Sequence, residues 1–91
     1  SMKKITYFEI RRVILERLLS ERCFGQKQMK RDSIAKFYRE SKHDAEKVID
    51  KLIANGLVLS KSKHYDSHIW LNMARLGEIR KIILERIGGL T

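Results

Sequence analysis

The sequence predicts an α+β fold that is mainly helical, with three helices, a β-hairpin and a C-terminal helix. Two observations predict it. Residues 41–56 carry apolar side chains at three- and four-residue steps before an Asn-Gly pair, which is typical of an amphipathic helix with a defined end. Residues 57–71 carry two β-favouring runs around a polar turn, which is typical of a hairpin.

The composition limits the kinds of protein that this chain can be. The chain has 91 residues, enough for one domain, and its hydrophobic content of 43% argues against disorder. Ser1-Met2 resembles a cleavage scar and a native start, so residues 3–91 are taken as the domain. The lone Cys23 excludes an intrachain disulfide and a cysteine-rich zinc site. No apolar run approaches the ~20 residues of a membrane span, and no signal peptide is visible, which predicts a cytoplasmic protein with no membrane partner.

The first predicted helix runs from about Thr6 to Cys23. We expect Thr6 to cap it, because Glu9 follows in the capping-box position. Gly25 begins a helix-breaking stretch, and Met29 then predicts a short extended segment against the sheet. The apolar positions of this helix form one wide face, made of Phe8, Val13, Ile14, Leu15, Leu18 and Leu19.

The second predicted helix, about Arg31–Tyr38, is short and leads through a tight turn into the third. In the third helix we expect Ser41 to cap the N-terminus together with Asp44, and Gly56 to take the left-handed conformation at the end. Two helices joined in this way predict a helix-turn-helix, with a plain helical hairpin as the alternative. The buried stripe of the third helix is Ala45, Val48, Ile49, Leu52 and Ile53.

The hairpin and the last helix follow. Strands are predicted at 57–63 and 68–71, and Trp70 in the return strand is expected to pack on the core. Asn72 is expected to cap a last helix at about Met73–Ile87, which Gly88-Gly89 would end. The first and last helices carry more apolar surface than a monomer of this size easily buries, which indicates a partner surface.

Three segments carry a resemblance to a known family: Ile34-Ala35, the run Leu52–Val58 that leaves the third helix, and Ile69–Leu71. With the order of the elements, they resemble the winged helix-turn-helix family, in particular small MarR-, PadR- and ArsR-like regulators of bacteria and archaea. The resemblance implies a sequence-specific double-stranded DNA-binding protein, a dimeric transcription regulator of an archaeon, a bacterium or one of their viruses. It implies that helix 42–54 enters the major groove, that the wing 58–70 meets the backbone, and that the terminal helices form a homodimer.

The net charge of +9 independently favours a polyanionic partner. Basic residues around the third helix are the predicted phosphate contacts, and Tyr65 at the wing tip is a candidate for a sugar or phosphate contact. These basic residues are Lys27, Lys30, Arg31, Lys36, Arg39, Lys61 and Lys63. The groove-facing positions that the resemblance implies are Lys42, His43, Asp44, Glu46, Lys47, Asp50 and Lys51.

The acids on this face leave alternatives open. They can read bases, pair with neighbouring lysines, or meet a protein, in which case the domain is a protein–protein interaction module of a larger assembly. An RNA-binding basic domain is a third possibility. His64 and His68 lie near Asp66, but an exposed turn is favoured there over a metal site. No catalytic or cofactor motif is present, so we expect neither an enzyme nor a cofactor.

Overall fold

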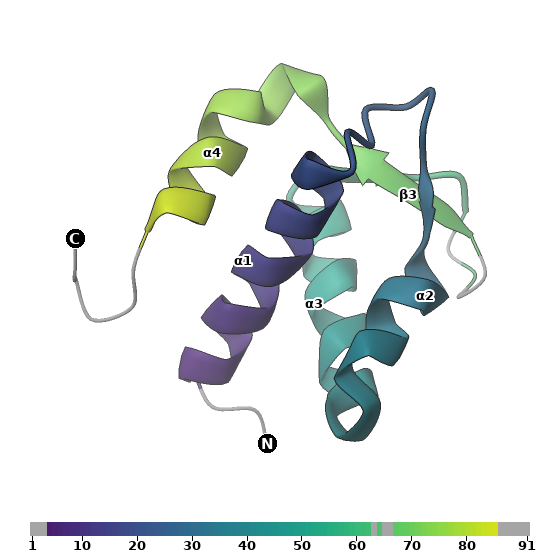
Figure 1. The fold of residues 1–91 in the computed structure, drawn as a ribbon, viewed down its shortest axis with the longest axis vertical. Helices are drawn as coiled ribbons and strands as arrows, with labels where there is room; N and C mark the ends of the chain where they lie inside the picture. Colours follow the sequence, from purple (N-terminus) through teal and green to yellow (C-terminus); the bar gives the residue numbers. More distant parts are fainter. Residues whose placement is uncertain (1–3, 63, 65–66, 86–91) are drawn as a thin grey trace.

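The computed structural model describes residues 4–62, 64 and 67–85. It shows an α+β chain that is mostly helical, as predicted (Figure 1). The elements, in chain order, are α1 (Lys4–Ser20), β1 (Met29–Lys30), α2 (Arg31–Ala35), a 3-10 segment (Lys36–Ser41), α3 (Lys42–Ala54), β2 (Val58–Ser60), β3 (His68–Leu71), a 3-10 turn (Met73–Arg75) and α4 (Leu76–Leu84).

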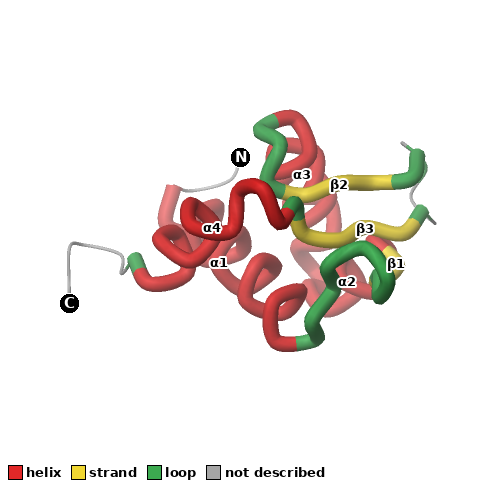
Figure 2. Tube along the Cα trace, turned by 90° about the horizontal axis from the view of Figure 1, so that it is seen from above, coloured by secondary structure: helices red, strands yellow, loops and turns green. Residues whose placement is uncertain are grey.

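Helix α1 is central, with α4 on one side and α2 and α3 on the other (Figures 1 and 2). The antiparallel sheet has the order β1-β3-β2, with Met29 opposite Ile69 and Val58 opposite Leu71. Strand β3 packs on α1, and β2 packs on α3. The predicted hairpin and the predicted extended segment at Met29 are therefore both confirmed.

The core lies where α1, α3, α4 and β3 meet. The predicted stripe of α3 is buried except for Ile53, which is half-buried against the core, as is Trp70. Cys23 is fully buried, and burial raises the pKa of its thiol. The largest apolar side chains of the core are Ile14, Leu15, Leu18, Ile49, Leu52, Ile69, Leu71 and Ile79.

Two predicted helix caps are wrong. Helix α1 already includes Lys4, so Thr6 lies inside the helix and cannot cap it. The Ser41 side chain makes no capping hydrogen bond, because the chain enters α3 directly from the preceding 3-10 segment. The predicted second helix also divides: α2 ends at Ala35, and Tyr38 has φ −106° and ψ 59°, which interrupts the helical path.

The end of α3 is joined to the segment before α4. Asn72 was predicted to cap the last helix, but its side chain caps the 3-10 turn before α4, where it accepts from the backbone N–H of Ala74 at 3.1 Å. Its Nδ2 donates to the Gly56 carbonyl at 2.8 Å, and Arg75 Nη1 donates to the Asn55 carbonyl at 3.2 Å. Helix α4 ends at Leu84, earlier than predicted, and the predicted stop at Gly88 lies outside the described residues.

Replacing Gly56 with alanine is expected to lower the free energy of unfolding by about 1–2 kcal/mol. Gly56 has φ +79°, and an added Cβ would lie 3.2 Å from Arg75 Nη1. Urea denaturation followed by circular dichroism measures the loss. Gly77→Ala is the matched control, because it lies within α4 and its added Cβ meets nothing within 4 Å. An equal loss in both variants would contradict the conformational argument.

No helix within the described ranges combines the length and the apolar character that crossing a bilayer requires.

Candidate nucleic-acid interface

Helix α3 presents a narrow stripe of exposed side chains on the face opposite its buried one. The stripe consists of His43, Lys47, Asp50 and Ala54, spaced at four, three and four residues along the helix. Because the buried face of α3 packs on α1 and α2, its exposed stripe is directed away from both helices. An outward helical face without a covering element is the shape that a nucleic-acid groove or a protein surface can accept.

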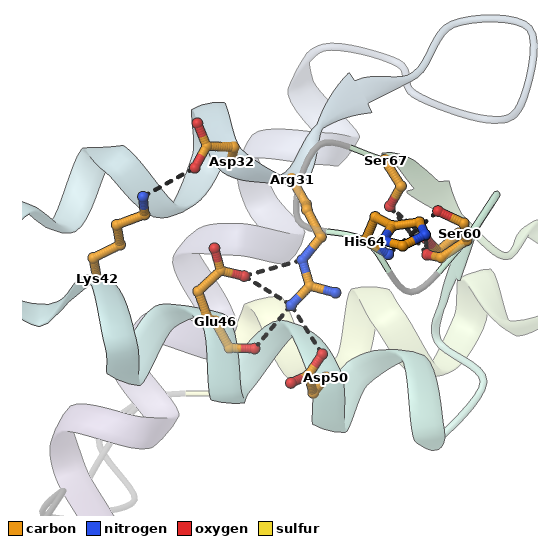
Figure 3. A network of polar contacts seen from close by, with 9 residues as sticks. Arg31, Asp32, Lys42, Glu46, Asp50, Ser60, His64 and Ser67 are labelled. Atoms are coloured by element: carbon orange, nitrogen blue, oxygen red, sulfur yellow. Dashed lines mark hydrogen bonds and ion pairs between the residues drawn. The ribbon is translucent and has the colours of Figure 1, made fainter.

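A buried arginine organises the flank of α3 that faces the hairpin. Arg31, at the start of α2, is 1% exposed, and its Nε and Nη2 donate to Glu46 Oε1 at 3.0 and 2.7 Å. Its Nη2 also donates to Asp50 Oδ1 at 2.9 Å (Figure 3). The backbone N–H of Arg31 donates to the Ser67 carbonyl at 3.0 Å. One residue thus ties α2, α3 and the hairpin together.

In this cluster one guanidinium is bonded to two carboxylates, so it neutralises part of their charge. Burial lowers the pKa of Arg31, but the hydrogen bonds to Asp50 and Glu46 outweigh it, so the pKa is raised above its ordinary value. Glu46 is itself only 7% exposed, while the Asp50 side chain is 62% exposed. Arg31 therefore offsets part of the negative charge that α3 would otherwise carry on this flank.

This cluster corrects two expectations. Arg31 was expected to contact phosphate and Glu46 to face the groove, but both side chains are buried and bonded to each other. Among the alternatives left open for the acids, pairing was expected with neighbouring lysines. The structure instead pairs Glu46 and Asp50 with an arginine 15 and 19 residues earlier in the chain.

The same side of α3 is basic one turn nearer its N-terminus, where Lys42 stands four residues before Glu46 (Figure 3). Lys42 Nζ lies 3.0 Å from Asp32 Oδ1, and Lys36 Nζ lies 3.3 Å from Asp32 Oδ2. Hydrogen bonds from Lys42 and Lys36 lower the pKa of Asp32, which keeps this carboxylate charged. One acid shared by two lysines leaves a net positive charge where α2 leads into α3.

The other α3 side chains predicted to contact DNA do not all point the same way. His43 and Lys47 are exposed on the outward stripe, and Asp44 is half-buried. Lys51 is exposed, but its Nζ lies 5.3 Å from the centroid of the Tyr7 ring, so its ammonium group is turned toward α1. His43 and Lys47 are therefore the basic side chains of α3 best placed to enter a groove.

The hairpin adds Lys61, which is exposed directly after β2, and Lys30 is exposed on the neighbouring strand β1. Serine contacts hold the far end of the hairpin: Ser67 is buried, and its Oγ lies 3.0 Å from Ser60 Oγ and donates to the Ser62 carbonyl at 3.1 Å (Figure 3). The predicted contacts Lys63 and Tyr65, and the side chain of Arg39, lie outside the described residues.

Sequence reasoning missed the part played by Asp32. Its spacing of four residues before Lys36 is a signal for that one ion pair, whereas its pairing with Lys42 depends on the fold.

Within the described part of the chain, no group of three or more His, Cys, Asp or Glu side chains is placed to hold a metal ion. The comparisons found no protein-family model, curated protein or solved structure that matches this chain.

Proposed function

We propose that this protein binds double-stranded DNA as a winged helix-turn-helix domain, with α3 in the major groove and the β2–β3 hairpin against the backbone. One observation carries the proposal. Helix α3 carries His43 and Lys47 on its outward stripe, while Arg31 pairs with the buried Glu46 and with Asp50 of that stripe. The order of helices and strands around α3, with a hairpin directly after it, supports the same arrangement.

In this proposal, the chemistry of each side chain decides whether it contacts a base or a phosphate. The major groove is about 12 Å wide and admits an α-helix. There Lys47 donates to guanine O6 and N7, and His43 donates to a base or a phosphate. The exposed lysines around the helix contact phosphates, which positions the domain without reading sequence. These lysines are Lys30, Lys36, Lys42 and Lys61.

A two-fold dimer belongs to the same proposal. Phe8 on α1 is 40% exposed and Leu84 on α4 is 78% exposed, so both terminal helices carry apolar side chains that a second copy would cover. Two copies related by a two-fold axis would place their α3 helices in successive major grooves, ~34 Å apart. This geometry suits a transcription regulator that recognises a palindromic site.

Fluorescence anisotropy with a labelled DNA duplex tests the proposal. We expect binding whose affinity falls steeply as salt rises, because phosphate contacts release counterions. Lys47→Ala and Lys61→Ala should each weaken binding, and Lys61→Ala should reduce the slope of log K against log salt by about one. Lys81→Ala removes the same charge from α4 and is the matched control.

Three outcomes would contradict the proposal. They are absence of duplex binding at low salt, equal losses in the Lys47 and Lys81 variants, and stronger competition by an RNA duplex than by a DNA duplex. The last outcome would indicate an RNA-binding domain. It would also rule out α3 in the major groove, because the major groove of A-form RNA is deep and narrow and side chains cannot read it.

A further inference from the structure

A second surface lies between α1, α2 and β1. It is a small cleft of about 60 Å³ with an apolar floor formed by Val13, Ile14, Met29 and Ile34 and with Arg17 and Phe37 among its lining residues. Its lining residues come from α1, β1, α2 and the 3-10 segment, and none of them belongs to α3 or to its outward stripe. The proposed DNA contacts leave it open.

Phe37 makes this cleft unusual. It is 68% exposed, more than Phe8 at 40% or Phe24 at 37%. Its ring is nevertheless held in place, since the Arg17 guanidinium carbon lies 5.3 Å from its centroid and the Tyr38 ring meets it edge-on at 6.2 Å. The non-helical backbone of Tyr38 ends the helical path directly after Phe37. A positioned aromatic ring beside an apolar cleft is typical of a binding surface.

The charge beside Phe37 indicates the chemistry of an occupant. Arg17 stacks its guanidinium on the Phe37 ring, and its ion pair with Glu21 is long, at 3.7 Å between Nε and Oε2. A guanidinium stacked in this way can still donate N–H groups in its plane to an incoming carboxylate. The chain's net charge of +9 also favours an acidic partner.

We propose that this cleft docks an acidic amphipathic segment of a partner protein. One aliphatic or aromatic side chain of the partner enters the cleft against Phe37, and a neighbouring carboxylate pairs with Arg17. The cleft is much smaller than the ~300–1,000 Å³ of pockets that enclose small molecules, so it suits part of one side chain. Because the residues that line the cleft are separate from the outward stripe of α3, we expect the domain to hold the partner and DNA at the same time.

Two synthetic amphipathic helical peptides test this proposal. They share one leucine stripe and carry either glutamates or lysines on the polar face. We expect the glutamate peptide to bind and to shift the amide NMR signals of Arg17, Ser33 and Phe37. Phe37→Ala and Arg17→Gln should each raise the Kd about tenfold, as expected when one central contact is lost. Phe24→Ala, which truncates another exposed ring, should leave the Kd unchanged.

The DNA affinity of the Phe37→Ala variant separates this surface from the proposed nucleic-acid interface. We expect that affinity to match the wild-type value. The proposal is overturned if the lysine peptide binds as tightly as the glutamate peptide, if Phe37→Ala binds the glutamate peptide normally, if the shifted amides cluster on α3, or if no amide shifts at millimolar peptide. A loss of DNA affinity in Phe37→Ala would also overturn it, because Phe37 would then belong to the DNA interface.

Discussion

Replacing Arg31 with methionine is expected to lower the free energy of unfolding by about 3–5 kcal/mol, because it leaves a buried carboxylate without its cation. Glu46 is 7% exposed and receives two hydrogen bonds from the Arg31 guanidinium. Methionine keeps the length and apolar stem of the side chain, so the loss reports mainly on the charge. Native domains have a stability of about 5–15 kcal/mol, so this variant is expected to be close to unfolding.

A double variant shows whether the unpaired charge is the cause. Arg31→Met with Glu46→Leu removes both charged groups, and it should recover most of the stability that Arg31→Met loses. Urea denaturation of both single variants and the double variant completes the cycle. Arg12→Met is the matched control, because Arg12 pairs with Glu9 and Glu16 on the exposed face of α1 and should contribute less than about 1 kcal/mol. Additive losses in the double variant would contradict the argument.

Replacing Ile69 with alanine is expected to destabilise the fold by about 2–5 kcal/mol, the range for a large aliphatic side chain removed from a core. Ile69 is fully buried in β3, the central strand, opposite Met29 on β1 and Ser60 on β2. Its truncation leaves a cavity beneath β3. Because β3 pairs with both β1 and β2, amide hydrogen exchange should accelerate in both neighbouring strands.

Ile69→Val provides the matched control, with an expected loss of about 0.5–1.5 kcal/mol. His68→Ala, on the exposed side of the same strand, should change the stability little. Both are measured by urea denaturation with the same baselines. If His68→Ala lowered the stability as much as Ile69→Ala, the inward and outward faces of β3 would have to be exchanged.

Features that depend on neighbouring residues were predictable from the sequence. The buried stripe of α3 follows from its own periodicity, because a helix places residues three and four apart on one face. The left-handed conformation of Gly56 and the capping by Asn72 follow from the chemistry of single residues. The structure confirms the first, and it places the second on the 3-10 turn that precedes α4. The apolar character of Met29 in a polar stretch was enough to place β1.

Features that depend on distant residues were not predictable. Sequence alone does not show that Arg31 reaches α3, since its partners lie 15 and 19 residues away and a basic residue in a basic chain is most simply read as surface. The caps at Thr6 and Ser41 failed for a different reason. A cap requires a particular backbone path into the helix, and tertiary packing determined that path here.

The hydrogen bonds from Asn72 and Arg75 to the last carbonyl groups around α3 have a mechanical consequence. They join the end of α3 to the start of α4, so α3 cannot rotate about its own axis without breaking them or carrying α4 along. We therefore expect a displacement of α4 to be transmitted to α3, the helix proposed to read DNA.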